Sequence, residues 1–423
     1  MKRIGTKTPF PPGFRGASLI EYGLLSALIG VAATGAVFEA GGNIADEFSG
    51  LTESVADAME DPDAFVMVFE TDNVVLYPMA GGALRIDWGD EAANASCGQD
   101  FVAGAAISCA YPGTGSYRVS ITGDLTEYGD IAGAATNGAI TRIVQWGNTG
   151  LTSLNNGFHT ATSLVDVPAD LPSSVTDLDF AFLRASSLND PDIGLWDVSG
   201  VTTLSHTFGE ATIFNVDIGS WDVSNVTSMR ALFWAAEDFD QDITDWDVSS
   251  VKNLQATFRD TKAFSYDLNS WDVSSVEVFQ STFKGSNYNG DISSWDMSSA
   301  THVNLMFEDN KVFDQNITGW DVSSIRDFSG MFARATSFDR PIGTWDMSMA
   351  VDLAYMFDGA ESFNQDISVW DVSSATNMEE MFENASAFSA DLSGWCVPLI
   401  ASEPLDFSTG SAMSSGPVWG TCP

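Results

Sequence analysis

The chain has 423 residues, and its 58 acidic and 17 basic side chains give a formal net charge of -41 at pH 7. This charge repels nucleic-acid backbones and anionic membrane surfaces, which excludes nucleic acid as a partner. Hydrophobic residues make up 44% of the sequence and the acidic residues are spread along it, so the composition argues against a disordered chain. The length predicts several domains.

The N-terminal region combines a basic leader with an apolar stretch. Residues 1–16 carry four basic side chains, Lys2, Arg3, Lys7 and Arg15. No charged residue occurs from Tyr22 to Phe38, which is a short membrane-spanning length at about 1.5 Å per residue. Because the stretch 17–60 lacks proline, it predicts one long α-helix, and the charge asymmetry around it predicts that the bulk of the chain lies outside the membrane.

The junction between leader and apolar stretch has a specific pattern. Gly16 is followed by Ala17, and a Glu21-Tyr22 pair opens the apolar run. This pattern resembles the processing site of Flp/Tad-type (type IVb) prepilins. The resemblance implies cleavage after Gly16 by a prepilin peptidase, insertion into the inner membrane, and assembly with like subunits through the N-terminal helix, with Glu21 as the assembly carboxylate. A simple signal anchor with Glu21 at the interface is the alternative.

Residues 63–130 change to the period of β-strands. The predicted strands are Phe65–Phe69, Val74–Tyr77, Leu84–Trp88 and Tyr117–Thr122, separated by clusters of glycine and proline. The Trp88-Gly89-Asp90 turn and the later Tyr117-Arg118-Val119 strand resemble PKD-type modules of bacterial surface proteins. The resemblance implies a small β-sandwich over residues 63–130.

The four cysteines form two local pairs, Cys97 with Cys109 and Cys396 with Cys422, and no zinc-type CxxC spacing occurs. Two disulfides in an oxidising compartment are the preferred interpretation, and buried free thiols are the alternative.

The C-terminal half is a repeat array. Tryptophan recurs with a period of 25 residues, once 24, from Trp196 to Trp395, and phenylalanine follows twelve residues after each of the first eight tryptophans. A fixed period of apolar residues predicts a solenoid over 196–395 whose units bury their apolar faces against one another. Residues 131–195 are expected to form an N-terminal cap with irregular repeats, and residues 396–423 a disulfide-tied C-terminal cap.

The repeated pattern resembles a bacterial surface-protein repeat that is similar to leucine-rich repeats. The resemblance implies a short strand near 226–229 and a helical turn near 230–236, and likewise in each unit. The expected fold is therefore multidomain: a long N-terminal α-helix, a small β-sandwich and a leucine-rich-repeat-like α/β solenoid with caps.

Two columns of aspartate accompany the tryptophans. One Asp follows each tryptophan except the last, as Asp222 follows Trp221, and a second column lies four residues before it. Asx-turn capping of nearby amides is the preferred role, and calcium shared between stacked carboxylates is the alternative. No other cofactor and no metal site is indicated. The three histidines, His159, His206 and His302, lie far from any cysteine, and no catalytic motif is present, so no enzyme activity is expected.

The expected function is that of an extracellular structural subunit resembling a type IVb pilin, which reaches the cell surface by way of the inner membrane. Its acidic solenoid would serve adhesion or bind a surface ligand that the sequence does not identify. A membrane-anchored surface adhesin that does not polymerise is the alternative.

Overall fold

The computed structural model describes residues 61–76, 79–89, 93, 96–97, 100–101, 107–129 and 138–423. Residues Pro62–Pro423 form one compact unit. The helix predicted over 17–60 lies outside the described residues, together with the predicted processing and assembly residues Gly16, Ala17, Glu21 and Tyr22.

The described chain begins with two antiparallel sheets. Their strands are β1 (Phe65–Leu76), β2 (Met79–Gly81), β3 (Leu84–Asp87), β4 (Asp100–Phe101), β5 (Ile107–Thr122), β6 (Leu125–Tyr128) and β7 (Ile140–Gln145). Five of them form one sheet in the order β4-β3-β5-β1-β7, and β2 pairs with β6 in a second sheet.

The two longest strands, β1 and β5, form the centre of the larger sheet. Phe65 pairs with Ile121 and Met67 with Val119, and all four side chains are buried. The run predicted at 65–69 and residues 74–76 of the run predicted at 74–77 are joined in β1 across a register shift between Thr71 and Asn73. The strand predicted at 117–122 is the end of β5, because pairing with β1 extends the strand back to Ile107.

The sheets merge with the coils that follow. Glu127 of β6 forms a parallel bridge with Ser153, and Arg142 of β7 forms one with Asp166. The ring of Phe65 lies 5.9 Å from that of Trp146 and 6.4 Å from that of Phe158. The sheets therefore cover the first coil of the repeat array, whose apolar interior would otherwise face water.

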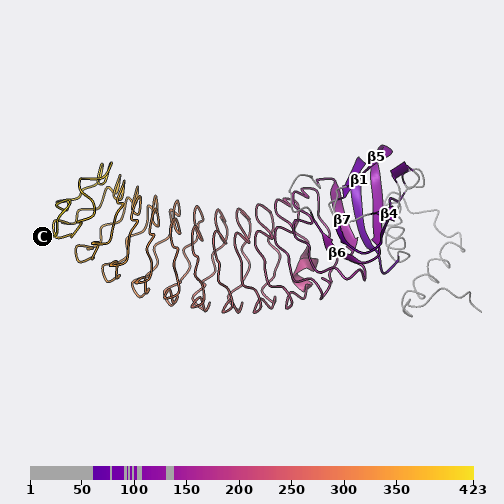
Figure 1. Ribbon diagram of the computed structural model, residues 1–423, viewed down its shortest axis with the longest axis horizontal. Helices are drawn as coiled ribbons and strands as arrows, with labels where there is room; N and C mark the ends of the chain where they lie inside the picture. Colours follow the sequence, from indigo (N-terminus) through magenta and orange to yellow (C-terminus); the bar gives the residue numbers. More distant parts are fainter. Residues whose placement is uncertain are drawn as a thin grey trace, which may run out of the picture. The chain divides into compact units, whose positions relative to one another are not determined.

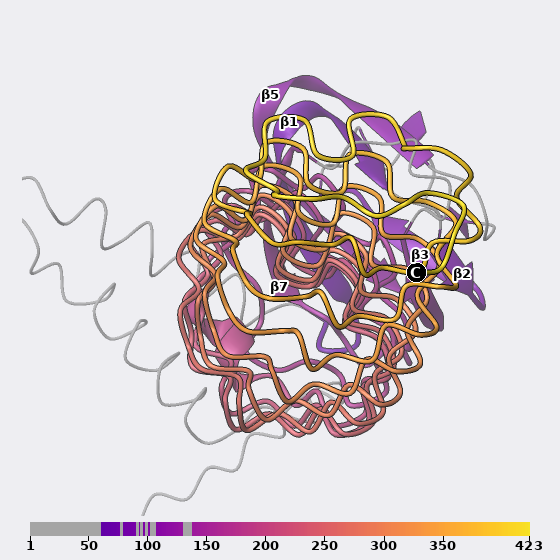
Figure 2. The ribbon, with the colours of Figure 1, turned by 90° about the vertical axis from the view of Figure 1, so that its left-hand side faces the viewer.

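Each coil contains one eight-residue segment whose last six residues are consecutive turn residues, and we call it a turn segment. The turn segments are 153–160, 177–184, 203–210, 228–235, 253–260, 278–285, 302–309, 327–334, 352–359, 377–384 and 403–410. In Figure 1 the coils follow β7 one after another, and Figure 2 shows them overlaid when the view is turned by 90°.

Hydrogen bonds between turn segments join each coil to the next. In segment 228–235, the amides at positions 2, 4, 6 and 8 donate to carbonyls at positions 1, 3, 5 and 7 of the next segment. Their distances are 3.0, 2.7, 3.0 and 2.7 Å. The amides at positions 5 and 7 donate within their own segment, to carbonyls three residues earlier. Bonds to the next segment thus alternate with bonds inside the segment, and these backbone amides find hydrogen-bond partners without a helix or a continuous strand.

The solenoid is not the α/β structure that the sequence predicted. Position 4 and position 8 of each turn segment have positive φ, as at Ala231 (51°) and Ala235 (53°). A left-handed residue cannot continue a right-handed helix, so the helical turn predicted near 230–236 is wrong. The strand predicted near 226–229 reduces to isolated parallel bridges at Ser228.

Helical structure is rare in the described part of the chain. It comprises the 3-10 helix η1 (Pro191–Leu195) and the residues Ala93, Ser96 and Cys97. The predicted fold of a long helix, a sandwich and a leucine-rich-repeat-like solenoid is therefore corrected to a nearly helix-free architecture of antiparallel sheets and turn-built coils.

Aromatic ladders fill the coils, as the repeated columns predicted. Consecutive tryptophans such as Trp221 and Trp246 stack with ring centroids 6.4 Å apart, at 2° between planes. The Nε1 of Trp246 donates to the carbonyl of Ile218 in the coil before it, at 3.1 Å. A parallel ladder of phenylalanines includes Phe233 and Phe258 at 5.9 Å. Stacked aromatic pairs of this kind stabilise the fold beyond the burial of each ring alone.

Candidate interaction surface

The aspartate columns cap turns. Asp222 accepts hydrogen bonds from the amide and hydroxyl of Ser224, at 3.1 and 2.6 Å. In the second column, Asp242 accepts the same pair from Thr244. The hydrogen bond from the Ser224 hydroxyl, and to a smaller extent that from the Ser224 amide, lowers the pKa of Asp222 below its ordinary value. The Asx-turn interpretation is thereby confirmed.

These carboxylates predict a loss of stability in acid. A pKa that is lowered in the folded state stabilises the fold above the unfolded pKa, near 3.9, and this contribution disappears as the pH falls through the folded pKa. We therefore expect the urea midpoint to fall between pH 5 and pH 2 more steeply in the native chain than in an Asp222→Asn, Asp247→Asn, Asp296→Asn variant.

The asparagine variant is a matched control, because asparagine can accept the same two hydrogen bonds, as Asn316 does at the aspartate position of the second column. Its Oδ1 accepts from the amide and hydroxyl of Thr318 at 3.2 and 2.7 Å. Equal slopes of midpoint against pH for the two proteins would contradict the prediction.

Metal and membrane features are not evident in the described part of the chain. No group of three or more His, Cys, Asp or Glu side chains is placed to hold a metal ion there. Within the same residues, no helix is long and apolar enough to cross a bilayer. The apolar stretch Tyr22–Phe38 lies outside them.

The three histidines are far apart in the coils. His302 Nδ1 lies 2.8 Å from the hydroxyl of Thr301, and His206 stacks on Phe180. Burial, assisted by the charge of Arg230, lowers the pKa of His206 to about 4, so this imidazole is neutral at physiological pH.

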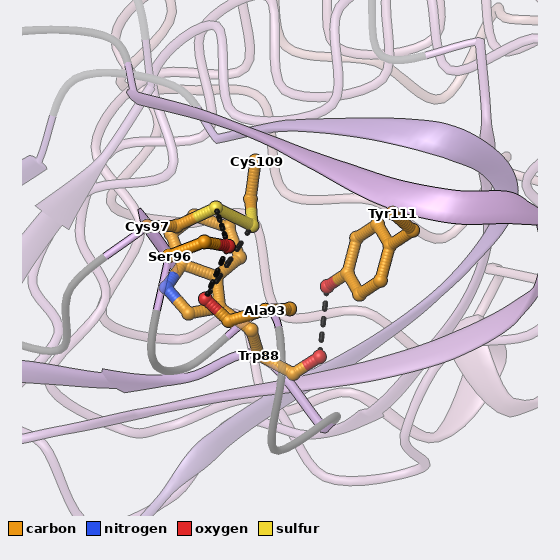
Figure 3. The surroundings of a disulfide bond; sticks show 6 residues. All are labelled: Trp88, Ala93, Ser96, Cys97, Cys109 and Tyr111. Atoms are coloured by element: carbon orange, nitrogen blue, oxygen red, sulfur yellow. Dashed lines mark hydrogen bonds between the residues drawn. A yellow bond between two sulfur atoms is a disulfide. The ribbon is translucent and has the colours of Figure 1, made fainter.

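Both predicted disulfides are present. Cys97 pairs with Cys109, and Cys396 pairs with Cys422 in the last coil. Figure 3 shows the first pair beside Trp88, whose carbonyl accepts a 2.8 Å hydrogen bond from the hydroxyl of Tyr111. The disulfides agree with folding in an oxidising compartment.

One strip of the coil surface differs from all these repeated features. In every turn segment except the last, the residues at positions 2, 5 and 6 are buried, and position 6 is Phe. Positions 1, 3, 4, 7 and 8 carry different residues from coil to coil, and we call them the variable face. In segment 228–235 the variable face consists of Ser228, Arg230, Ala231, Trp234 and Ala235.

Aromatic and cationic side chains gather on the variable face of four early segments. The rings of Phe180 and His206 stack with centroids 4.3 Å apart, and His206 lies 6.5 Å from Trp234. The guanidinium of Arg259 lies over Trp234, 5.6 Å from the ring centroid. Such half-buried aromatic and arginine side chains are typical of protein-binding surfaces.

A groove of about 320 Å³ lies further along the same face. Its lining comes from positions of the variable face in four successive segments: Leu305, Glu308, Ser329, Gly330, Ala333, Arg334, Asp352, Ala354, Tyr355 and Asn377. The groove therefore shows that these positions share one surface. Tyr355 is 38% exposed at its edge.

Charges surround the groove. Arg334 contacts Glu308 and donates to Asp309 at 2.8 Å and to Asp358 at 3.3 Å, and Lys284 pairs with Glu308. The Arg334 hydrogen bond lowers the pKa of Asp309, whereas burial raises the pKa of Asp358. Partly exposed pairs of this kind contribute more to specificity than to stability.

Comparison with known families accounts for the repeats. The family described as "Mycoplasma protein of unknown function, DUF285" matches residues 152–270, 214–320 and 301–415, which together span more than half of the chain. The chain belongs to the DUF285 family. The first DUF285 match begins one residue before the first turn segment. No curated protein matches the chain, and no solved structure matches it.

The DUF285 assignment corrects the earlier resemblances. The matched repeats and the nearly helix-free described residues overturn the identification as a Flp/Tad-type prepilin fused to a PKD-like module and a leucine-rich-repeat-like solenoid. The residues on which the pilin resemblance rested are outside the described part.

Proposed function

We propose that this DUF285 protein is a cell-surface interaction protein without catalytic activity, and that its variable face binds the partner. The observation that carries the proposal is the cluster of aromatic and arginine side chains on this face, in which Phe180 stacks on His206 and Arg259 lies over Trp234. A surface without a partner has no need of such side chains, whereas a recognition surface uses them.

Three further properties support the proposal. Two disulfides suit an extracellular location. The net charge of -41 keeps such a protein soluble and discourages nonspecific contact with anionic surfaces. Trp234, Arg259 and Tyr355 are the residue types that contribute most to binding energy at protein interfaces.

The test is binding of the labelled full chain to intact cells of the organism that makes it. We expect Trp234→Ser, Tyr355→Ser to reduce this binding at least tenfold, because both side chains lie on the variable face. The matched control is Leu195→Ser, Val369→Ser, which also removes two large apolar side chains but at positions away from the variable face, exposed by 70% and 75%.

The location is tested separately by protease treatment of intact cells, which should cleave the protein if it is displayed outside. Equal binding by the two double variants, or protection of the whole chain from protease, would contradict the proposed function.

A further inference from the structure

The charges of the variable face are sorted along the solenoid. Segments 228–235, 253–260 and 278–285 contribute the cations Arg230, Arg259 and Lys284, together with one acid, Asp260, which pairs with Arg259. Segments 352–359, 377–384 and 403–410 contribute the acids Asp352, Asp358, Glu379, Glu380, Glu383, Glu403 and Asp406. The same surface therefore has a cationic part and a strongly acidic part.

About the gap between segments 302–309 and 327–334, two of these cations have an acid at the mirrored place, Lys284 at Asp358 and Arg259 at Glu383. If a second copy lies face to face with the first and runs in the opposite direction, a two-fold axis through this gap places each segment against its mirror segment. Side chains at the same position of the turn segment then face each other. The oppositely charged pairs that result between copies are Lys284 with Asp358 and Arg259 with Glu383, and His302 lies opposite Asp327. Arg334 and Asp309, which pair within each chain, lie beside the axis and face the same two residues of the second copy.

Side-chain size follows the same relation as charge. At position 4, Leu305 faces Gly330, Tyr355 faces Ser281, and Glu380 faces Ala256, so a large residue meets a small one in each case. Leu305 and Gly330 belong to the groove, which lies beside the proposed axis. Matched side-chain size and charge at facing positions are typical of a specific interface.

From this match we propose that the partner of the variable face is a second copy of this chain, bound antiparallel about a two-fold axis between segments 302–309 and 327–334. This inference rests on the proposed function, since it names the partner of the same face. The contact is isologous, so every favourable pair occurs twice. The eight segments involved extend about 40 Å at the spacing of hydrogen-bonded strands, which is long enough for an interface of standard size.

Sedimentation equilibrium of the purified full chain tests the inference. We expect a dimer that dissociates as salt is raised from about 0.05 M to 1 M, because screening weakens exposed ion pairs. One variant reverses the cationic side (Arg259→Glu, Lys284→Glu), and a second reverses the acidic side (Asp358→Lys, Glu383→Arg). Each variant alone should dimerise at least tenfold more weakly than the native chain.

Mixing the two variants is the decisive arm. In the mixed dimer, the reversed cationic side of one variant faces the reversed acidic side of the other, and the two native sides face each other at the opposite end. All facing charges are then opposite in sign, so dimerisation should return. Lys311→Glu, Arg340→Glu changes the net charge as much as the first variant but lies off the variable face, and it should dimerise like the native chain. Circular dichroism confirms that each variant is folded.

A native chain that stays monomeric, variants that dimerise normally, or a mixture that does not recover would overturn the inference. Monomeric copies together with binding to intact cells that depends on Trp234 and Tyr355 would overturn only the antiparallel pairing. Loss of that dependence would overturn the proposed function instead.

Discussion

Replacing Phe283 by alanine is expected to lower the free energy of unfolding by about 3–5 kcal/mol. Phe283 is fully buried in the middle of the phenylalanine ladder, with ring centroids 5.6 Å from Phe258, 5.7 Å from Phe307 and 4.2 Å from Tyr288. Alanine leaves a cavity that fixed coils on both sides cannot close. Because coils stabilise one another only through neighbours, the array should also unfold in two steps instead of one.

Urea unfolding followed by tryptophan fluorescence and circular dichroism measures both effects. Val369→Ala is the control, since that side chain is 75% exposed and its truncation should change stability by less than about 0.5 kcal/mol. A Phe283→Ala protein with the native midpoint and a single transition would show that the ladder does not couple the coils.

Replacing Ala256 by proline should destabilise the solenoid by about 3 kcal/mol or more. The Ala256 amide donates to the carbonyl of Gln280 in the next coil at 2.9 Å, and the residue has a φ of 56°. Proline removes the donor and fixes φ near -65°, so both features are lost together.

Ala256→Gly is the matched control for the backbone. Glycine retains the amide and adopts positive φ without strain, so its stability should stay within about 1 kcal/mol of the native chain. Thermal unfolding of the two variants under identical conditions measures the difference. If both variants lost the same stability, the side chain of Ala256, and not the inter-coil hydrogen bond, would be responsible.

Apolar periodicity was a reliable guide to the core of the array. Trp221 and Phe233 lie in columns that repeat with the coil, and the structure places both columns inside. The hydrophobic effect acts on every coil in the same way, so a repeated apolar residue has few alternatives to burial. The capping of backbone amides by aspartate could also be predicted, because the Asp222-x-Ser224 spacing is that of an Asx turn.

The backbone conformation of the turn segments could not be predicted in the same way. Ala231 and Ala235 favour helices by propensity, yet both adopt positive φ because their amides bond to the next coil. A signal was present in other coils, where glycine takes these positions at Gly285, Gly330 and Gly359. Tertiary hydrogen bonding between coils decided the local structure against the local preference.

The first coils of the array lie within residues 131–195, which the sequence predicted as a cap with irregular repeats. Trp146 lies seven residues before the first turn segment, at the position that Trp221 has in its own coil, and it contacts Trp196 with ring centroids 6.1 Å apart. No tryptophan occurs at this position in the intervening coil, where Asp170 replaces it, so the tryptophan period alone begins too late. The phenylalanine column, which includes Phe158 and Phe182, continues through both coils.

The repeated residues alone do not reveal the variable face. Arg259 and Glu383 attract no attention singly in a chain with a net charge of -41. Their relation emerges only when the turn segments place both at position 7 of the same surface, on opposite sides of a common midpoint.

The direction of the hydrogen bonds between turn segments also governs how the molecule responds to tension. These bonds join neighbouring coils, and each tryptophan of the 25-residue column from Trp196 to Trp395 is bonded back to the coil before it, so a pull on the chain ends loads the outermost coil first. Each coil of 25 residues that peels away releases about 80–90 Å of contour length. The array would then yield stepwise and absorb mechanical work, while the remaining coils stay folded.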